Sequence, residues 1–298
     1  MRLVTEEQIR SVVTVADARV AVHDAFCALA NGAALTPDEM AMKLDHGGEL
    51  HVKGAYLGGD VIAFKAATGS FPAGRNSGFS AVIDAATGEP AAILQDGGWL
   101  TEMRTAAASA VTAAALSNPN PATLAILGAG IQASFQVAAM RDLFDLDVVR
   151  VWSRSAETAE RFATSNDAVV AATITEAVAD ADIIICCTPS HEPLLSRSMV
   201  TPGAHVIAMG SDMVGKREVD ADLLRSADLI VSDSVHVTAR VGELQHVPDI
   251  VATSVDLGDV LIGAAVGRTD SAQISVADLC GLGIQDAAMA QLVMSRLD

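Results

Sequence analysis

The sequence has few basic residues for its length. Lys and Arg together number 19 among 298 residues, against 37 Asp and Glu, and the formal net charge is −18. Such a surface repels the phosphates of nucleic acids and of anionic membranes, so we expect neither as a partner. The acidic residues are spread along the chain, which is typical of a soluble surface. An anionic ligand must therefore be held by a few local cations.

Metal-ligand clusters and long apolar runs are also lacking. The four cysteines form no CxxC pair and no Cys/His cluster, which argues against a metal site and fits a reducing cytoplasm; they are Cys27, Cys186, Cys187 and Cys280. Although 51% of the residues are hydrophobic, polar residues interrupt every stretch of about 20, so no transmembrane helix is expected. Residues 1–10 indicate a helical start without an apolar signal core.

The pattern of elements changes near residue 117. Before it, helices are expected over 16–29 and 101–116, and strands with hairpin turns over 49–55, 61–67, 80–83 and 91–94. After it, short apolar strands alternate with helices; the strands are expected over 122–127, 147–152, 169–172, 182–187, 205–209 and 229–232. We predict an α/β protein, with a Rossmann doubly wound parallel sheet over 117–274 and an α+β domain over 1–116 and 275–298.

A glycine-rich segment follows the first strand of the second domain. It reads Gly128-Ala129-Gly130-Ile131-Gln132-Ala133, a G-x-G-x-x-A motif between a strand and a helix. The first glycine permits a tight turn, the second lets backbone N–H groups approach a pyrophosphate, and the alanine allows close packing of helix on strand. A glycine turn with a purely structural role is the alternative. We predict that this segment binds a dinucleotide.

The end of the next strand bears on the choice between NAD and NADP. An acidic residue there would bind the ribose 2′-hydroxyl, but the chain has Ser153 and Arg154, which suit a 2′-phosphate. NADP(H) is therefore modestly favoured, unless Arg154 stacks on the adenine or faces solvent. Thr188 and Ser190 follow the fourth strand and either border the cofactor crevice or form an ordinary turn.

Several segments together resemble the ornithine cyclodeaminase/mu-crystallin family. They are Phe64-Lys65, the stretch from Leu100 to Ala107 around Arg104, the glycine motif, Gly210-Ser211-Asp212 and Gly215-Lys216. The resemblance runs from about residue 20 to near the C-terminus. It implies a homodimer of bilobal subunits, in which one lobe forms the dimer and part of the substrate site and the C-terminal helix returns to that lobe. It also implies hydride transfer between a nicotinamide and the α-carbon of an amino or imino acid.

The resemblance assigns roles to three charged residues. Lys65 and Arg104 match the cations that hold the substrate α-carboxylate, and Asp212 matches the acid that moves protons at the substrate nitrogen. Each has an alternative: a strand-edge charge in water for Lys65, a surface ion pair with Glu102 for Arg104, and a helix cap for Asp212. Residues 280–286 either place backbone near the substrate or form a glycine turn with Asp286 capping the last helix.

The chain also departs from the family pattern. Glu39 stands near the position of a third carboxylate-binding arginine, and Lys53-Gly54 replaces the usual Met-Pro. His51 aligns with the glutamate that cyclodeaminases direct at the ornithine side-chain amine, which argues against a substrate with a distal ammonium group. Lys53 either contacts a second carboxylate of the substrate or pairs with Glu39. The segment from His51 to Tyr56 resembles a subgroup linked to iminosuccinate reduction.

Three functions follow from these residues. The first is an NAD(P)-dependent imino-acid reductase or amino-acid dehydrogenase, for which the conversion of iminosuccinate to aspartate is the expected reaction, with Lys65, Arg104, Lys53 and His51 at the substrate. The second is a cyclodeaminase that releases ammonia while its cofactor is recycled, which the retention of Asp212 favours. The third is a non-catalytic ligand-binding protein like mu-crystallin, which the presence of all three family residues opposes.

Overall fold

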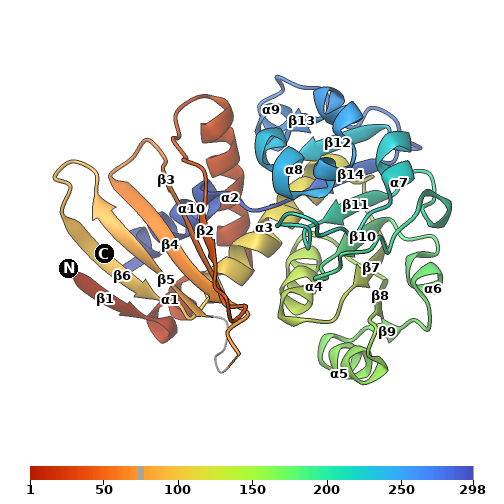
Figure 1. The fold of residues 1–298 in the computed structure, drawn as a ribbon, viewed down its shortest axis with the longest axis horizontal. Coiled ribbons are helices and arrows are strands. Elements are labelled where there is room, and N and C mark those ends of the chain that lie inside the picture. The colour runs from red at the N-terminus through yellow and green to blue at the C-terminus, as the bar shows by residue number, and fades with distance from the viewer. Residues whose placement is uncertain (73–76, 298) are drawn as a thin grey trace. The chain divides into compact units, whose positions relative to one another are not determined.

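The computed structural model describes residues 1–72 and 77–297, and the chain divides into two compact units (Figure 1). Unit 1 consists of Met1–Ala108 and Leu282–Asp298, and unit 2 consists of Ser109–Gly281. Among the described helices, none is long and apolar enough to cross a membrane. Each unit has its own sheet, and the two are described separately.

Unit 1 is built on a mixed sheet of six strands in the order β1-β6-β5-β4-β3-β2. The strands are β1 Arg2–Thr5, β2 Met40–Lys43, β3 Glu49–Tyr56, β4 Val61–Gly69, β5 Ser77–Asp84 and β6 Pro90–Gln95. All neighbours pair antiparallel except β1 and β6, which are parallel. The register places Lys53 of β3 opposite Lys65 of β4, so these two cations lie side by side on one face of the sheet.

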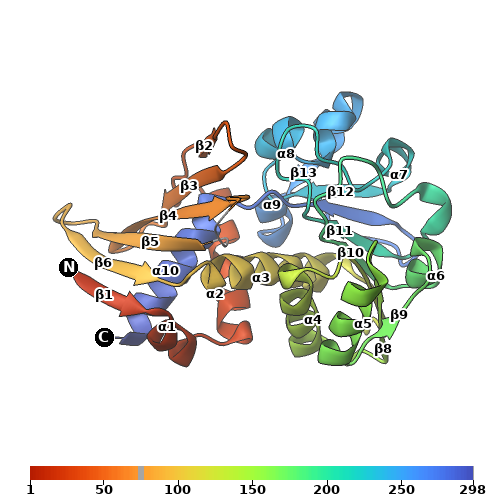
Figure 2. The same cartoon turned by 60° about the horizontal axis from the view of Figure 1, so that its bottom comes forward.

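Among the described residues, three helices belong entirely to unit 1, and a fourth begins there. They are α1 Glu6–Val12, α2 Val15–Ala30, α10 Gly283–Leu297 and the first part of α3 Trp99–Leu116. Helix α10 packs against β3 and β4, and α2 packs against α10 (Figure 2). The C-terminal segment of the chain therefore contributes side chains to the sheet face that carries Lys65.

The N-terminus differs from its predicted form. Residues 1–10 were expected to begin a helix, but Arg2–Thr5 form β1 beside β6, and the side chain of Val4 is fully buried. The side chain of Thr5 accepts a hydrogen bond from the backbone N–H of Gln8 in a capping box, which fixes the start of α1. An N-cap residue has extended backbone angles, so the helix cannot continue upstream of it.

Unit 2 has a sheet of eight strands, all parallel, in the order β13-β12-β14-β11-β10-β7-β8-β9. The strands are β7 Thr123–Leu127, β8 Val148–Trp152, β9 Val169–Val170, β10 Ile183–Cys186, β11 His205–Ala208, β12 Leu229–Ser232, β13 Val255–Asp256 and β14 Ser275–Asp278. The central strand β10 is apolar throughout and fully buried. A strand covered on both faces reads as a continuous apolar run, which is the signal seen in the sequence.

Helices and short 3-10 turns connect these strands. They are α4 Ile131–Leu143, α5 Ala156–Asn166, α6 Ile174–Val178, α7 Ala221–Ser226, α8 Val235–Val241, α9 Leu257–Leu261, and the turns η1 Arg197–Met199, η2 Glu243–His246 and η3 Pro248–Thr253. The predicted α/β class, with a doubly wound parallel sheet beside an α+β unit, is confirmed. The carboxyl ends of the parallel strands meet at one edge, where ligands bind in such sheets.

The boundaries between the units differ from those predicted. Residues 275–278 were assigned to the first domain, but they form β14, which is inserted between β11 and β12 of unit 2. The first boundary falls inside α3 rather than after residue 116. The end of α3 belongs to unit 2 because the carbonyl oxygen of Leu116 accepts hydrogen bonds from Arg268 and Ser275.

Candidate functional site

The glycine motif forms a tight turn between β7 and α4. Gly128 has a φ of 111°, in the region that favours glycine, and its N–H donates to the carbonyl oxygen of Trp152 at 2.9 Å. A Cβ atom at Gly128 would lie 2.7 Å from the carbonyl oxygen of Cys187. The turn thus brings the ends of β7, β8 and β10 together in a way that a larger residue would prevent.

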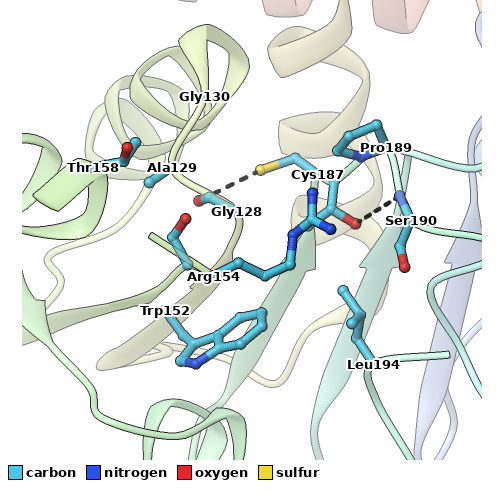
Figure 3. A pocket seen from close by; sticks show the side chains of 12 residues that line it. Gly128, Ala129, Gly130, Trp152, Arg154, Thr158, Cys187, Pro189, Ser190 and Leu194 are labelled. Carbon is cyan, nitrogen blue, oxygen red and sulfur yellow. Dashed lines mark hydrogen bonds between the residues drawn. The ribbon is translucent and has the colours of Figure 1, made fainter. Parts of the chain in front are cut away.

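A pocket of about 200 Å³ opens beside this turn (Figure 3). Gly130 is the N-cap of α4, and nothing lies within 4 Å of the place where its Cβ would be. The free backbone N–H groups at the start of a helix favour an anion both by hydrogen bonding and by the helix dipole. The open glycine turn and the helix start therefore fit the pyrophosphate of a dinucleotide.

The predicted cofactor residues lie partly in this pocket. Those that line it are Gly128, Gly130, Ser153, Arg154, Thr188 and Ser190. The other three are in the first turn of α4 but do not line it: Ile131 is exposed, Gln132 accepts a hydrogen bond from Gln136, and Ala133 is fully buried. Close packing of the small Ala133 is the role expected of the last motif position.

Arg154 supplies the positive charge of the pocket. Its side chain extends into the pocket beside Trp152 (Figure 3), and it forms no ion pair within residues 1–72 and 77–297. Ser155, the next residue, is the N-cap of α5 and does not line the pocket. No acidic residue is among those lining the pocket in the part of the chain that the structure describes. The described lining of this pocket therefore includes one cation and no carboxylate.

A second cluster of charges lies in unit 1, where Lys65 and Arg104 converge on Asp286. Lys65 is 4% exposed, Arg104 7% and Asp286 5%. Asp286 Oδ1 lies 3.2 Å from Lys65 Nζ and 3.3 Å from Arg104 Nε. Arg104 also donates from Nη1 to Oε1 of the buried Gln285 at 2.9 Å. The water-exposed alternative for Lys65 and the surface pair of Arg104 with Glu102 are both wrong.

Burial changes the acidity of the lysine in this cluster. Desolvation lowers the pKa of Lys65 to about 8, with Arg104 and Lys53 acting in the same direction and Asp286 opposing them. A buried ammonium surrounded by other cations is easier to deprotonate, because its charge is poorly compensated. Lys65 can consequently exchange a proton near neutral pH, in addition to attracting a carboxylate.

The residues that depart from the family pattern form a network next to Lys65. Glu39 Oε2 lies 3.3 Å from Lys53 Nζ, and Glu39 Oε1 lies 2.5 Å from His51 Nδ1. Burial raises the pKa of Glu39, but the hydrogen bond from His51 and the charge of Lys53 outweigh it and lower the pKa to about 2. Lys53 therefore pairs with Glu39, which was one of its two alternatives, and the ionised carboxylate of Glu39 also contacts His51.

Asp212 lies in unit 2, in the loop after β11. Its Oδ1 atom accepts a hydrogen bond from Lys216 Nζ at 2.6 Å, and its side chain is 44% exposed. No helix begins at Asp212, so the interpretation as a helix cap is wrong. An accessible carboxylate next to a lysine is compatible with proton transfer, and this role of Asp212 stays a prediction.

Sequence reasoning missed several residues of both clusters. Capping of the last helix by Asp286 was one of the two alternatives for residues 280–286, but α10 begins at Gly283 and the side chain of Asp286 turns to Lys65 and Arg104. Two buried cations imply a buried counter-charge, but the sequence alone does not say which acid supplies it. The pocket residues Trp152, Thr158 and Leu194 carried no motif that could have identified them.

Several known proteins are similar to this chain over nearly its whole length. The chain is 38% identical over 99% of its length to a putative dehydrogenase, RB0419, of Rhizobium meliloti (strain 1021), 95% of which is covered. It is 32% identical to the iminosuccinate reductase of Paracoccus denitrificans (strain Pd 1222), covering 99% of this chain and 96% of the relative. The solved structure of an archaeal alanine dehydrogenase dimer with bound NAD superposes with a TM-score of 0.92 at 27% identity, covering 99% of this chain and 95% of that one.

A family model also matches this chain over its whole length. The model, described as "Ornithine cyclodeaminase/mu-crystallin family", matches residues 1–298. The expectation of a nicotinamide-dependent oxidoreductase agrees with these relatives. The chain therefore belongs to the ornithine cyclodeaminase/mu-crystallin family.

Proposed function

We propose that the chain is an NAD(P)-dependent oxidoreductase that acts on the C–N bond of a small amino or imino acid. The observation that carries this proposal is the convergence of Lys65 and Arg104 on one carboxylate, that of Asp286, in a buried setting. The same two cations have the charge and the donor geometry to bind the α-carboxylate of a substrate. The dinucleotide pocket of unit 2 supports the cofactor part of the proposal.

Each residue has a stated role in this proposal. The bound nicotinamide would supply or accept a hydride at the substrate carbon. Lys65 and Arg104 would hold the carboxylate and so fix the orientation of that carbon. Asp212 would take or give the proton at the substrate nitrogen, in line with the role of the matching acid in the family.

Iminosuccinate is the substrate that we propose within this class. It carries a second carboxylate, and Lys53 lies opposite Lys65 on the same sheet face as the natural cation to bind it. These side chains carry an excess of positive charge, because there are three cations, Lys53, Lys65 and Arg104, and only two carboxylates, those of Glu39 and Asp286. To bind this substrate, Lys53 must break its ion pair with Glu39 and pair with the second carboxylate of the substrate instead. The 32% identity to an iminosuccinate reductase supports the proposal.

The absorbance of the reduced cofactor tests the proposed reaction. We expect NADPH or NADH to be oxidised when oxaloacetate and ammonia are supplied together, because they form the imine in solution. A cyclic ketimine is the second substrate to try, and oxaloacetate without ammonia is the control. Absence of turnover with every imine of such a panel would refute the reductase.

A cyclodeaminase is the second candidate, and one contact favours it. Glu39 restores an ionised carboxylate beside His51, at the position where cyclodeaminases bind a side-chain ammonium group. This reaction recycles its cofactor, so the chain would release ammonia from ornithine without net change in absorbance. Measuring ammonia and absorbance in the same sample separates the two candidates.

NADP(H) is the cofactor form that we propose. Arg154 and Ser153 line the pocket at the end of β8, where an acid would otherwise bind the ribose 2′-hydroxyl. Parallel titrations with NADPH and NADH test this choice. Tighter binding of NADH would contradict it.

A homodimer is the proposed assembly, and the cytoplasm the proposed compartment. The sheet face opposite Lys65 carries exposed apolar side chains, namely Met40, Met42, Ile62 and Phe79. An apolar face of this kind is typical of a surface covered by another subunit. The dimer of the related alanine dehydrogenase supports the same assembly, and the four free cysteines fit a reducing compartment.

A further inference from the structure

One buried carboxylate connects two of the loops at the carboxyl edge of the unit 2 sheet. Glu218 is fully buried, and its Oε1 atom accepts hydrogen bonds from the N–H and the hydroxyl of Thr188, at 2.6 and 2.7 Å. Its Oε2 atom accepts a hydrogen bond from the N–H of Gly210 at 2.7 Å. Thr188 belongs to the loop after β10 and Gly210 to the loop after β11, so Glu218 holds both loops.

The backbone around Glu218 holds the rest of the loop after β10. The N–H of Leu194 donates to the carbonyl oxygen of Glu218 at 2.7 Å, and the N–H of Arg217 donates to the carbonyl oxygen of Ser190 at 2.9 Å. Thr188, Ser190 and Leu194 all line the dinucleotide pocket. One wall of the pocket, residues 188–194, is therefore attached at both ends to Glu218.

The loops after β10 and β11 are packed so closely that a small displacement of one would displace the other. A Cβ atom at Gly210 would lie 2.0 Å from the carbonyl oxygen of Thr188 and 2.7 Å from the carboxyl carbon of Glu218. Backbone and side-chain atoms packed this closely cannot shift independently of one another. The position of Gly210 is thus coupled to that of the pocket wall through Glu218.

Other acidic groups lie behind this carboxylate. Glu243, from η2, accepts hydrogen bonds from the backbone N–H groups of Glu218 and Val219. Asp278, from β14, accepts one from Leu244, and the thiol of Cys186 lies on β10. Burial raises the pKa of Glu218 to about 7 in spite of its three hydrogen bonds, and burial together with the neighbouring acids raises the pKa of Asp278 to about 8.

We propose that Glu218 is a positioning residue for the dinucleotide: it holds residues 188–194 against the loop after β11 and so keeps the pocket wall in place. This inference rests on the proposed binding of NAD(P) in the pocket of unit 2. The ionised carboxylate accepts hydrogen bonds at both oxygens, whereas protonation places a hydrogen on one of them and displaces a donor. Cofactor affinity therefore falls as the pH decreases through the range in which Glu218 titrates.

The substitution Glu218→Gln tests this role through cofactor binding. The amide oxygen can still accept from Thr188, but the amide nitrogen is a donor and opposes the N–H of Gly210. We expect the dissociation constant for NADPH, measured by fluorescence titration with NADH in parallel, to rise about tenfold. We also expect the affinity of the unsubstituted chain to fall between about pH 8 and pH 6, and this fall to be absent from the variant.

Two further variants make the result specific. Glu160→Gln, on the exposed face of α5, is the matched control and should leave both affinity and pH profile unchanged. Thr188→Val removes one donor only, so affinity should fall by a smaller factor, about threefold, and keep its pH dependence. If Glu218→Gln does not fold, the Thr188→Val titration decides alone, and an unchanged affinity there would overturn the inference.

The outcomes also separate this inference from the proposed function. If the unsubstituted chain binds neither NADPH nor NADH, the proposed function fails, and the inference fails with it. If the unsubstituted chain binds cofactor and Glu218→Gln binds it equally well with the same pH profile, only the inference fails.

Discussion

Glu39 is the side chain on which the two candidate activities differ most. It neutralises Lys53 at 3.3 Å and remains ionised because its pKa is lowered to about 2. A dicarboxylate substrate would be repelled by Glu39 and would compete with it for Lys53. A diamino acid would instead be attracted by Glu39. One carboxylate thus has opposite effects on the two substrate classes.

The substitution Glu39→Gln should reveal which substrate class is used. For a reductase of iminosuccinate, we expect KM to fall about fivefold, corresponding to roughly 1 kcal/mol from the removed charge. For a cyclodeaminase, ornithine turnover should decrease instead. Steady-state kinetics with both substrates measure this, and an equal change in KM for mono- and dicarboxylate imines would rule out a contact between residue 39 and the substrate side chain.

Arg154 is the residue that should determine the choice of cofactor. Removing its guanidinium in Arg154→Ala deletes a charge-assisted hydrogen bond to a 2′-phosphate, worth about 1.5–3 kcal/mol. We expect the dissociation constant for NADPH to rise about 10- to 100-fold, with that for NADH nearly unchanged. A comparable loss for both cofactors would show that Arg154 contacts a part of the dinucleotide that they share.

At the scale of elements, local patterns were predictable and long-range pairings were not. The strand, glycine turn and helix at 123–143 follow from an apolar run and a motif, both of which are local. Strand β14 was missed because four residues, Ser275–Asp278, gain their strand conformation only by pairing with β11 and β12. Residues 2–5 form β1 for the same reason, since their partner β6 lies about 90 residues away in the chain.

The candidate site shows the same division. Lys65 and Arg104 could be named because the resemblance places them, and their burial agrees with the apolar sequence around Lys65 and the Ala-rich helix around Arg104. Asp286 and Glu218 could not be named from the sequence, because their partners lie far away in the chain. These partners are Lys65 and Arg104 for Asp286, and Thr188 for Glu218. A single sequence contains no record of such contacts.

The uncovered face of the unit 1 sheet leads to a prediction about assembly. Phe79 is 41% exposed and shares this face with Ile62. If a second copy covers the face, Phe79→Asp places a charge in a buried interface and should convert the dimer to a monomer. Sedimentation or light scattering measures the mass, and Val266→Asp, in an exposed loop of unit 2, is the control that should remain dimeric. A Phe79→Asp dimer as stable as the unsubstituted one would place the interface elsewhere.

At the scale of the whole molecule, the buried acids of unit 2 should make stability depend on pH. Burial raises the pKa of Glu218 to about 7 and of Asp278 to about 8, and raises that of Glu243 as well. Between about pH 5 and pH 8 the folded chain consequently binds more protons than the unfolded chain, so stability falls as the pH rises. The net charge of −18 acts in the same direction through repulsion.

Thermal unfolding across this pH range tests the prediction. We expect Tm to decrease from about pH 5 to pH 8, with a loss of a few kcal/mol, on the basis of ~1.4 kcal/mol per unit of pKa shift. Asp278→Asn removes one of the titrating groups and should flatten the curve. A Tm that does not fall with pH over this range would mean that these acids are already ionised in the folded chain.

The most direct measurement combines turnover and cofactor binding in Lys65→Ala. Lys65 lies in unit 1 and the dinucleotide pocket in unit 2, so the substitution should leave the affinity for NADPH unchanged. Oxidation of NADPH with oxaloacetate and ammonia should fall by at least about 100-fold, because a buried carboxylate contact is lost. Turnover that persists in Lys65→Ala would contradict the assignment of the two buried cations to the substrate.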